Sequence, residues 1–240
     1  VVAGIAPFNF PLNLAVHKIA PAIAAGCPII LKPSGTTPLS TLMLAKIIDC
    51  TALPKGAVSI LPMSRQTGNR LVTDDRISLL SFTGSPEVGW KMKRDAGRKK
   101  VVLELGGNAG VIISHGADLD AAVAKCVVGG FSYSGQVCIH TQRIYIVKDI
   151  FEAFAQKFVD KVLQLKSGNP LDPETDMAVM IDLPNAERVE SWVNEAMASG
   201  AKILAGGKRE GSFMQPTVIT GTKEFMQVCS AEVFGPVVVI

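Results

Sequence analysis

The sequence predicts an α/β protein in which a doubly wound parallel sheet is followed by a second α/β domain. Over the first 104 positions, short runs rich in Val, Ile and Leu alternate with helical patterns. Such alternation is typical of a parallel sheet whose two faces are both covered by helices. The dipeptide Gly106-Gly107 interrupts the pattern, and a second series of strand-like and helical runs follows it. We therefore expect a Rossmann-like first domain and a domain boundary at the two glycines.

The elements of the first domain are expected where these runs fall. Strands are expected at Val1–Ile5, Pro28–Lys32, Ala57–Leu61, Ile77–Phe82 and Lys100–Leu103, and helices at Leu12–Ala25, Pro38–Ala52, Gly68–Thr73 and Pro86–Asp95. Ligands of such sheets bind beyond the carboxyl ends of the strands. The loops that matter are therefore Ala6–Pro11, Lys32–Pro38, Pro62–Gly68 and Thr83–Gly89.

The second domain is expected to mix strands and helices in the same way. Asp118 is expected to cap a helix that runs through Phe131. Apolar residues from Phe151 to Leu165 step by three and four, which predicts a helix that buries one face. A further helix is expected at Asn185–Ser199, and strands at Val111–Ile113, Ile144–Val147, Lys202–Leu204, Thr217–Ile219 and Pro236–Ile240.

Composition excludes several classes of protein. The net charge of +3 over 240 residues is too small and too scattered for binding to nucleic acid or to a membrane surface. The longest apolar stretch, Ile19–Leu31, is interrupted by proline and glycine and is too short to span a bilayer. The chain begins and ends inside apolar runs, which we expect of a piece cut from a longer protein.

The cysteines indicate a reducing compartment. They are odd in number and far apart, and no CxxC pair occurs among Cys27, Cys50, Cys126, Cys138 and Cys229. This pattern is typical of free thiols in a cytoplasmic protein rather than of a disulfide framework or a zinc site. We expect no metal site.

The segment Tyr133–His140 contains the candidate nucleophile, Cys138. A free cysteine has a pKa of about 8.5 and is mostly protonated at neutral pH, so catalysis would need a base and an oxyanion site nearby. The alternative is that Cys138 is a small buried hydrophobe, as many free cysteines are.

Polar residues follow several of the expected strands. Asn9 stands between aromatic residues in the first loop, where its amide either points at a ligand or caps the next helix. Lys32 ends the second strand. It either binds phosphate or ribose hydroxyls or is an ordinary solvated loop lysine. Gly84 and Ser85 open a helix whose N-terminus is an anion site or an ordinary cap.

Two carboxylates complete the set of candidates. Glu104 ends an apolar strand, and burial there would favour its protonated form and make it a usable base near neutrality. Glu232 precedes Phe234 and the turn at Gly235-Pro236. A salt-bridged structural glutamate and a plain turn with a core phenylalanine are the respective alternatives.

Taken together, the candidate residues lie in sequence motifs that resemble those of one family. The sequences PFNFP, KPS, FTGSPEVG, LELGG, GQVC and EVFGP occur in this order from one end of the chain to the other. In this set the chain resembles the aldehyde dehydrogenase superfamily, whose members oxidise aldehydes to acids with NAD or NADP. By this resemblance, residues 1–105 form part of a dinucleotide-binding domain, and residues 106–240 form a catalytic domain that is incomplete at its C-terminus.

The resemblance implies a role for each motif residue. Cys138 is the nucleophile, Asn9 is the oxyanion-hole amide together with the Cys138 backbone N–H, and Glu104 is the general base. The implied cofactor-binding residues are Phe8, Lys32, Ser34, Gly35, Gly68, Gly84, Ser85, Val88, Leu105, Glu232 and Phe234. A thiohemiacetal and then a thioester would form on the cysteine, and the presence of Glu104 favours a free acid as product over a coenzyme A ester.

Cofactor, substrate and assembly are expected along the same lines. Many NAD-specific relatives have Glu at the position of Gly35, and its absence removes the repulsion of a 2′-phosphate. We therefore expect that NADP is accepted, or preferred over NAD. Relatives that recognise phosphorylated aldehydes have Arg at the position of Val137. The valine therefore favours an uncharged aldehyde of small or medium size. The parent protein is expected to be a homodimer or homotetramer.

Two other functions stay open at the level of sequence. A Cys–His hydrolase would pair Cys138 with His140, His17 or His115, although it would have no use for the cofactor loops. A nucleotide-binding piece with little or no turnover is the second, because the family carries further segments before and after the part matched here.

Overall fold

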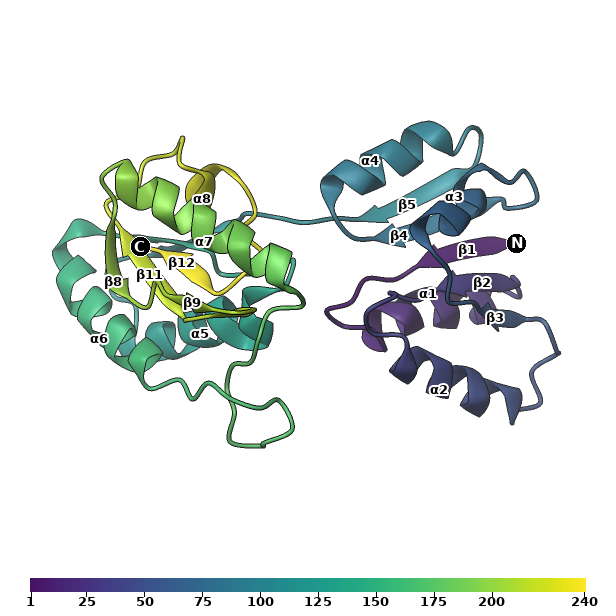
Figure 1. The fold of residues 1–240 in the computed structure, drawn as a ribbon, viewed down its shortest axis with the longest axis horizontal. Helices are drawn as coiled ribbons and strands as arrows, with labels where there is room; N and C mark the ends of the chain where they lie inside the picture. The colour runs from purple at the N-terminus through teal and green to yellow at the C-terminus, as the bar shows by residue number, and fades with distance from the viewer. The chain divides into compact units, whose positions relative to one another are not determined.

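The computed structural model describes all 240 residues, which form two compact units, Val1–Gly106 and Gly107–Ile240 (Figure 1). Each unit is an α/β structure with its own sheet. None of the helices combines the length and the apolar composition that a bilayer-spanning segment needs.

The first unit is built on a five-stranded parallel sheet with the order β3-β2-β1-β4-β5. Its strands are β1 (Val2–Ile5), β2 (Ile29–Lys32), β3 (Val58–Ile60), β4 (Leu79–Thr83) and β5 (Lys100–Glu104). Its helices are α1 (Asn13–Ala24), α2 (Leu39–Asp49), α3 (Arg65–Thr73) and α4 (Pro86–Asp95). The strand order reverses direction between β1 and β4, which is the switch point where such sheets bind ligands. The predicted parallel, Rossmann-like fold is confirmed.

Helices cover both faces of this sheet. Figure 1 shows α1 and α2 on one side and α3 and α4 on the other. Each face has its own apolar cluster. Ile19 and Leu31 belong to the cluster under α1 and α2, whereas Ile5, Leu80 and Phe82 belong to the cluster under α3 and α4. Strands that bury both faces need nearly continuous apolar sequence, which explains the Val, Ile and Leu runs.

The second unit contains a mixed sheet with the order β6-β7-β12-β11-β8, in which only β8 runs antiparallel to its neighbour. The strands are β6 (Gly110–Ile113), β7 (Arg143–Ile146), β8 (Lys202–Ala205), β11 (Thr217–Thr220) and β12 (Val237–Val239). The helices are α5 (Leu119–Phe131), α6 (Phe151–Leu163), α7 (Leu183–Ala198) and the short α8 (Gln227–Ser230). As predicted, the Asp118 carboxylate caps α5 by accepting from the N–H groups of Asp120 and Ala121.

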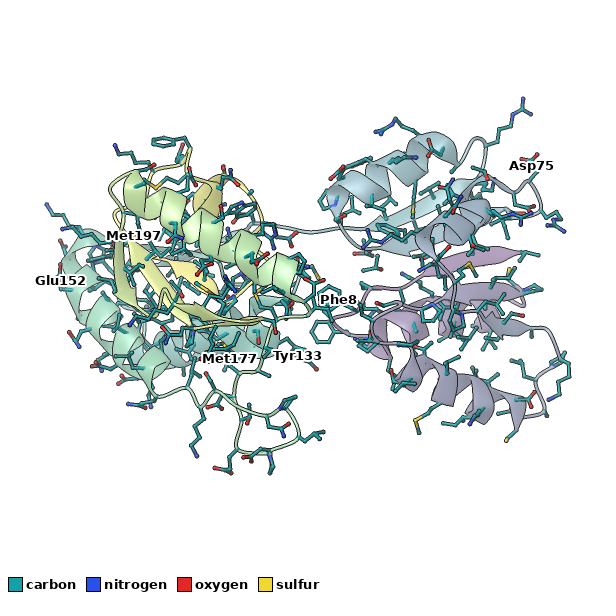
Figure 2. All side chains as sticks on the ribbon, viewed as in Figure 1. Phe8, Asp75, Tyr133, Glu152, Met177 and Met197 are labelled. Atoms are coloured by element: carbon teal, nitrogen blue, oxygen red, sulfur yellow. The ribbon has the colours of Figure 1, made fainter.

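Side chains of β12 alternate between two apolar clusters, one on each face of this sheet. Val238 packs with Phe154 and Phe158 of α6, and Val237 and Val239 belong to the cluster that contains the buried face of α7. Figure 2 shows the side chains that fill the space between sheet and helices, with Glu152 labelled on α6. The position after α5 is occupied by a short 3-10 helix, η1 (Ser132–Gly135), which leads to Cys138.

The structure differs from the sequence-based prediction at the start of α3 and in three short elements. Helix α3 begins at Arg65 rather than at Gly68, because the Ser64 hydroxyl accepts a hydrogen bond from the Thr67 N–H and caps the helix earlier. The hairpin β9 (Arg209–Glu210) and β10 (Phe213–Met214) was not predicted, nor was α8. Elements of two to four residues span only about one period of a hydrophobic pattern, too little to show that it repeats.

Candidate active site

Cys138 is exposed on a turn that follows α5 and η1. The cysteines Cys126 and Cys229 are buried, and burial raises the pKa of the Cys126 thiol. The alternative interpretation of Cys138 as a buried small hydrophobe is therefore wrong. An exposed thiol on a fixed turn is accessible to an electrophile.

Strained backbone precedes this turn and is anchored by side chains. Tyr133 and Ser134 have φ angles of 53° and 55°, in the left-handed region that costs a non-glycine residue about 1–2 kcal/mol. The Ser134 hydroxyl donates to the Ala178 carbonyl at 2.7 Å. Gln136 accepts from the Ile181 N–H at 3.0 Å and donates to the Tyr133 carbonyl at 3.2 Å. These bonds compensate the strain and fix the direction in which the chain enters the turn.

The His140 side chain is buried in the interior. Its Nε2 donates to the Gly130 carbonyl at 2.8 Å, and the ring is 4% exposed. Burial lowers the pKa of His140 to about 4, although the hydrogen bond with the Gly130 carbonyl acts to raise it. His115 instead faces Asp149, at 4.0 Å. The Cys–His hydrolase thus loses the histidine that is nearest to Cys138 in sequence.

Glu232 meets the backbone next to the nucleophile. Its Oε1 accepts from the Gly107 N–H at 3.1 Å, and a Cβ atom at Gly107 would lie 3.3 Å from the Cys138 carbonyl oxygen. Burial raises the pKa of the Glu232 carboxyl, whereas the Gly107 hydrogen bond and the nearby Arg188 charge act to lower it. The second unit therefore brings Cys138 and Glu232 to the same place, on either side of Gly107.

The turn after Glu232 packs directly on the nucleophile segment. Phe234 has a φ of 48°, again in the left-handed region. A Cβ at Gly135 would lie 2.1 Å from the Gly235 carbonyl oxygen. Only glycine at position 135 allows this approach, and its positive φ of 66° favours glycine as well. The two backbones are thus in direct contact.

In the first unit, Asn9 lies in the loop at the carboxyl end of β1. Hydroxyl groups of the next loop and helix hold this loop: Thr37 donates to the Phe8 carbonyl at 3.3 Å, and Thr41 donates to the Pro11 carbonyl at 3.2 Å. Helix α1 begins at Asn13 with Leu12 at its N-cap position. Leu12, rather than Asn9, thus holds the N-cap position of α1.

Lys32 lies at the carboxyl end of β2 beside a second cation. Burial lowers the pKa of Lys32, and the positive charge of Arg65 lowers it further. A Cβ at Gly68 would lie 2.8 Å from Lys32 Cδ, so the glycine makes room for the lysine stem. Ser34 is hydrogen-bonded to Thr36 at 2.8 Å, and Gly35 is exposed with open space around its Cα.

The N-terminus of α4 lies at the carboxyl end of β4 and is the candidate anion site. Ser85 occupies the N-cap position but makes no capping bond with its side chain, and Pro86 is the first helical residue. Free N–H groups and the helix dipole favour a negative group there. Gly84 lies against the Phe82 ring, and Gly89 lies against Leu105, with a Cβ at Gly89 only 2.4 Å from Leu105 Cδ2. The first turn of α4 carries Glu87 and the exposed Val88.

Glu104 is exposed at the end of β5, so the expectation of a buried carboxylate is wrong. The buried ionisable group is Lys18 of α1, which sequence reasoning missed. Lys18 is 5% exposed, and its Nζ donates to the Thr83 hydroxyl at 2.6 Å. Burial lowers the pKa of Lys18 to about 8, and the negative charge of Glu104 acts to raise it. The signal that could have identified Lys18 was a single cation inside the apolar pattern of α1.

The candidate residues thus divide between the two units. Asn9, Glu104 and the residues around Lys32 and Gly84 lie in the first unit, whereas Cys138, Glu232 and Phe234 lie in the second. No group of His, Cys, Asp and Glu in the structure has the make-up of a metal site.

Comparison with known proteins gives a consistent picture. Residues 1–240 match the sequence profile described as "Aldehyde dehydrogenase family". The chain is 46% identical over 241 residues to 3-sulfolactaldehyde dehydrogenase of Priestia megaterium, covering 100% of this chain and 50% of that protein. It is 43% identical over 245 residues to lactaldehyde dehydrogenase of Methanococcus aeolicus, covering 100% of this chain and 52% of that protein. The chain thus spans about half the length of the curated relatives it matches.

Solved structures agree. Aldehyde dehydrogenase 21 of Physcomitrella patens, in complex with the reaction product succinate, superposes with a TM-score of 0.96 at 46% identity over 99% of this chain and 50% of that one. Glyceraldehyde-3-phosphate dehydrogenase of Methanocaldococcus jannaschii, complexed with NADP, gives 0.96 at 40% identity over 100% and 54%. Betaine aldehyde dehydrogenase of Staphylococcus aureus, in complex with NAD+, gives 0.95 at 37% identity over 99% and 49%.

The buried His140 predicts how stability depends on pH. Its pKa is about 4 in the folded protein and about 6.5 in an unfolded chain. Between these values the unfolded state binds a proton that the folded state does not, so stability falls as pH falls from about 6.5 to 4, by about 3 kcal/mol in total. His140→Gln, which keeps a donor for the Gly130 carbonyl, should flatten this part of the profile in urea unfolding at a series of pH values. The exposed His17→Gln is the matched control. Equal slopes for His140→Gln and the wild type would contradict the assignment.

Proposed function

The chain belongs to the aldehyde dehydrogenase family, and from this premise we propose that it carries the nucleophile and cofactor-binding groups of an NAD(P)-dependent oxidation of an aldehyde to a carboxylic acid. The observation that carries the proposal is the exposed Cys138 on an anchored turn whose backbone contacts the Glu232 loop.

The first chemical step forms a thiohemiacetal on Cys138. The Cys138 thiolate attacks the aldehyde carbon, forming a C–S bond, and the electron pair of the carbonyl moves to its oxygen. The Asn9 amide and the Cys138 backbone N–H hold the resulting oxyanion of the thiohemiacetal. Removal of one such preorganised donor typically lowers kcat by about 10²–10³. Nicotinamide, when bound, would supply the acceptor for the hydride that must leave the former aldehyde carbon to give the thioester on Cys138.

The second step releases the acid. The thioester on Cys138 is hydrolysed by a water molecule whose proton passes to Glu104, and the sulfur leaves as the thiolate. Lys18 places a positive charge near Glu104. Exposure of Glu104 supports access by water. These features favour the free acid over a coenzyme A ester as product.

Either nicotinamide dinucleotide fits the cofactor residues. Relatives of known structure contain NADP in one case and NAD+ in another. The N-terminus of α4 would bind the pyrophosphate, and Glu232 would bind the nicotinamide ribose. Phe234 would lie near the nicotinamide ring. Arg65 places a second positive charge near Lys32, which supports acceptance of a 2′-phosphate.

A small aldehyde is the proposed substrate. The relatives are named for lactaldehyde and 3-sulfolactaldehyde, and Val137 places no charge next to Cys138. A cytoplasmic location and a homodimeric or homotetrameric parent protein are part of the same proposal. The five free cysteines support the former.

A second candidate is a nucleotide-binding chain with little turnover, because the chain spans about half of its relatives. Titration with NAD and NADP beside an aldehyde assay, on this chain and on the full-length parent, separates the two candidates. If both proteins bind the dinucleotide but only the parent turns over the aldehyde, the second candidate holds for the isolated chain.

Glu104→Gln is expected to separate the two chemical steps in the full-length parent. Rapid mixing with aldehyde and cofactor should still give a burst of reduced cofactor, because acylation of Cys138 does not need the base. The steady-state rate should fall by about 10²–10⁴, the usual contribution of a general base. The exposed Glu152→Gln on α6 is the control and should behave like the wild type. An unchanged steady-state rate in Glu104→Gln would remove Glu104 from the mechanism.

Gly35→Glu is expected to shift preference from NADP toward NAD. Open space at Gly35 accepts the side chain, and its negative charge would repel the 2′-phosphate. The Kd for NADP should rise by about tenfold or more, the equivalent of about 1.4 kcal/mol, while that for NAD falls or stays constant. Gly35→Gln separates size from charge and should change the NADP Kd much less. A wild-type Kd for NADP ten times weaker than that for NAD would contradict the proposal.

A further inference from the structure

We propose that Gln142 is a positioning residue that fixes Glu232 for the nicotinamide ribose, an inference that rests on the proposed function. Gln142 lies just after the Cys138 turn, and its side chain is completely buried, with 0% exposed. A buried amide of this kind is retained only if its polar atoms are satisfied. Its partners identify what it does.

The Gln142 amide holds the chain on both sides of Glu232. Its Nε2 donates to the carbonyl of Ala231 at 2.8 Å and to that of Val228 at 2.9 Å. Its Oε1 accepts from the N–H of Val233 at 2.8 Å. Both amide hydrogens and the amide oxygen are thus used on one loop. The residue before Glu232 and the residue after it are fixed by the same side chain.

Other side chains hold the carbonyl groups of this loop. Asn108 donates to the carbonyls of Cys229 and Ala231 at 2.7 and 3.2 Å, and Arg188 donates to the Val233 carbonyl at 2.8 Å. The Val233 N–H, by contrast, donates to Gln142, and Val233 is fully buried. Loss of the Gln142 amide would leave a buried donor without an acceptor, which favours movement of the loop.

The main chain of Gln142 is itself immobilised. Its carbonyl accepts from the Val239 N–H of β12 at 2.7 Å, and its N–H donates to the His140 carbonyl at 2.9 Å. The side chain therefore projects from a fixed point of the segment that also carries Cys138. Through Gln142, the nucleophile segment sets the position of the ribose-binding carboxylate.

The orientation of Glu232 depends on this loop position. The Gly107 N–H donates to Glu232 Oε1 at 3.1 Å, a length that a small displacement of the loop would break. Replacement of Gln142 should thus weaken the contact between Glu232 and the nicotinamide ribose. Binding of the adenosine half of the cofactor, whose proposed ligands lie in the first unit, should not change.

The test is a double-mutant cycle of dinucleotide binding in the full-length parent. Gln142→Leu, of similar shape, should raise the Kd for NAD or NADP by about tenfold in equilibrium titration, as should Glu232→Gln. In the Glu232→Gln background, Gln142→Leu should add less than about twofold, because residues that act through one another are not additive. Multiplying effects would overturn the proposal.

Two further readouts distinguish positioning from general destabilisation. The Kd of adenosine 5′-monophosphate and the rate of Cys138 alkylation by iodoacetamide should stay within about twofold of the wild type in Gln142→Leu. Hydrogen exchange of the peptide from Val228 to Val233 should become faster. A matched control, the exposed Gln164→Leu, should alter none of these. Equal weakening of mononucleotide and dinucleotide binding would contradict a role through Glu232.

If Gln142→Leu does not fold, Gln142→Asn takes its place in the same cycle, since it keeps the amide but is shorter by one methylene group. The same two outcomes then support or overturn the proposal. A wild-type parent that binds no dinucleotide would instead refute the proposed function itself, so the two failures are distinguishable.

Discussion

The candidate site depends on direct backbone packing between the Cys138 segment and the Glu232 loop. A Cβ at Gly135 would overlap the Gly235 carbonyl, and Gly107 lies between the Cys138 carbonyl and the Glu232 carboxylate. Because no side chain separates these backbones, the thiol and the carboxylate keep a fixed separation without being adjacent in sequence. The strain at Tyr133, Ser134 and Phe234 is tolerated because hydrogen bonds on both sides hold these residues in place.

Much of the fold could be predicted because burial on both faces of a parallel sheet leaves a strong sequence pattern. Helix α4 has the predicted limits Pro86–Asp95, and each predicted strand overlaps an observed one. What failed were features set by single hydrogen bonds. The Ser64 cap shifts the start of α3. The strands of the β9–β10 hairpin are too short to show a repeating hydrophobic pattern.

The site was predicted less completely than the fold. The motifs placed Asn9, Lys32, Gly84 and Glu104 at the carboxyl ends of strands, because loops of parallel sheets gather there. Sequence reasoning missed Lys18 and Gln142, whose partners, Thr83 and Val233, are distant in the chain. It also placed Glu104 in the interior, since a strand end in an apolar run gives no sign of which face its last side chain takes.

The central claim is that Cys138 carries the acyl group during aldehyde oxidation. The most direct measurement is mass spectrometry of the full-length parent with Glu104 replaced by Gln, quenched in acid after mixing with aldehyde and cofactor. The account predicts that the mass of the acyl group appears on the peptide that contains Cys138, and only when the cofactor is present. An adduct on another residue, or none under conditions that reduce the cofactor, would contradict it.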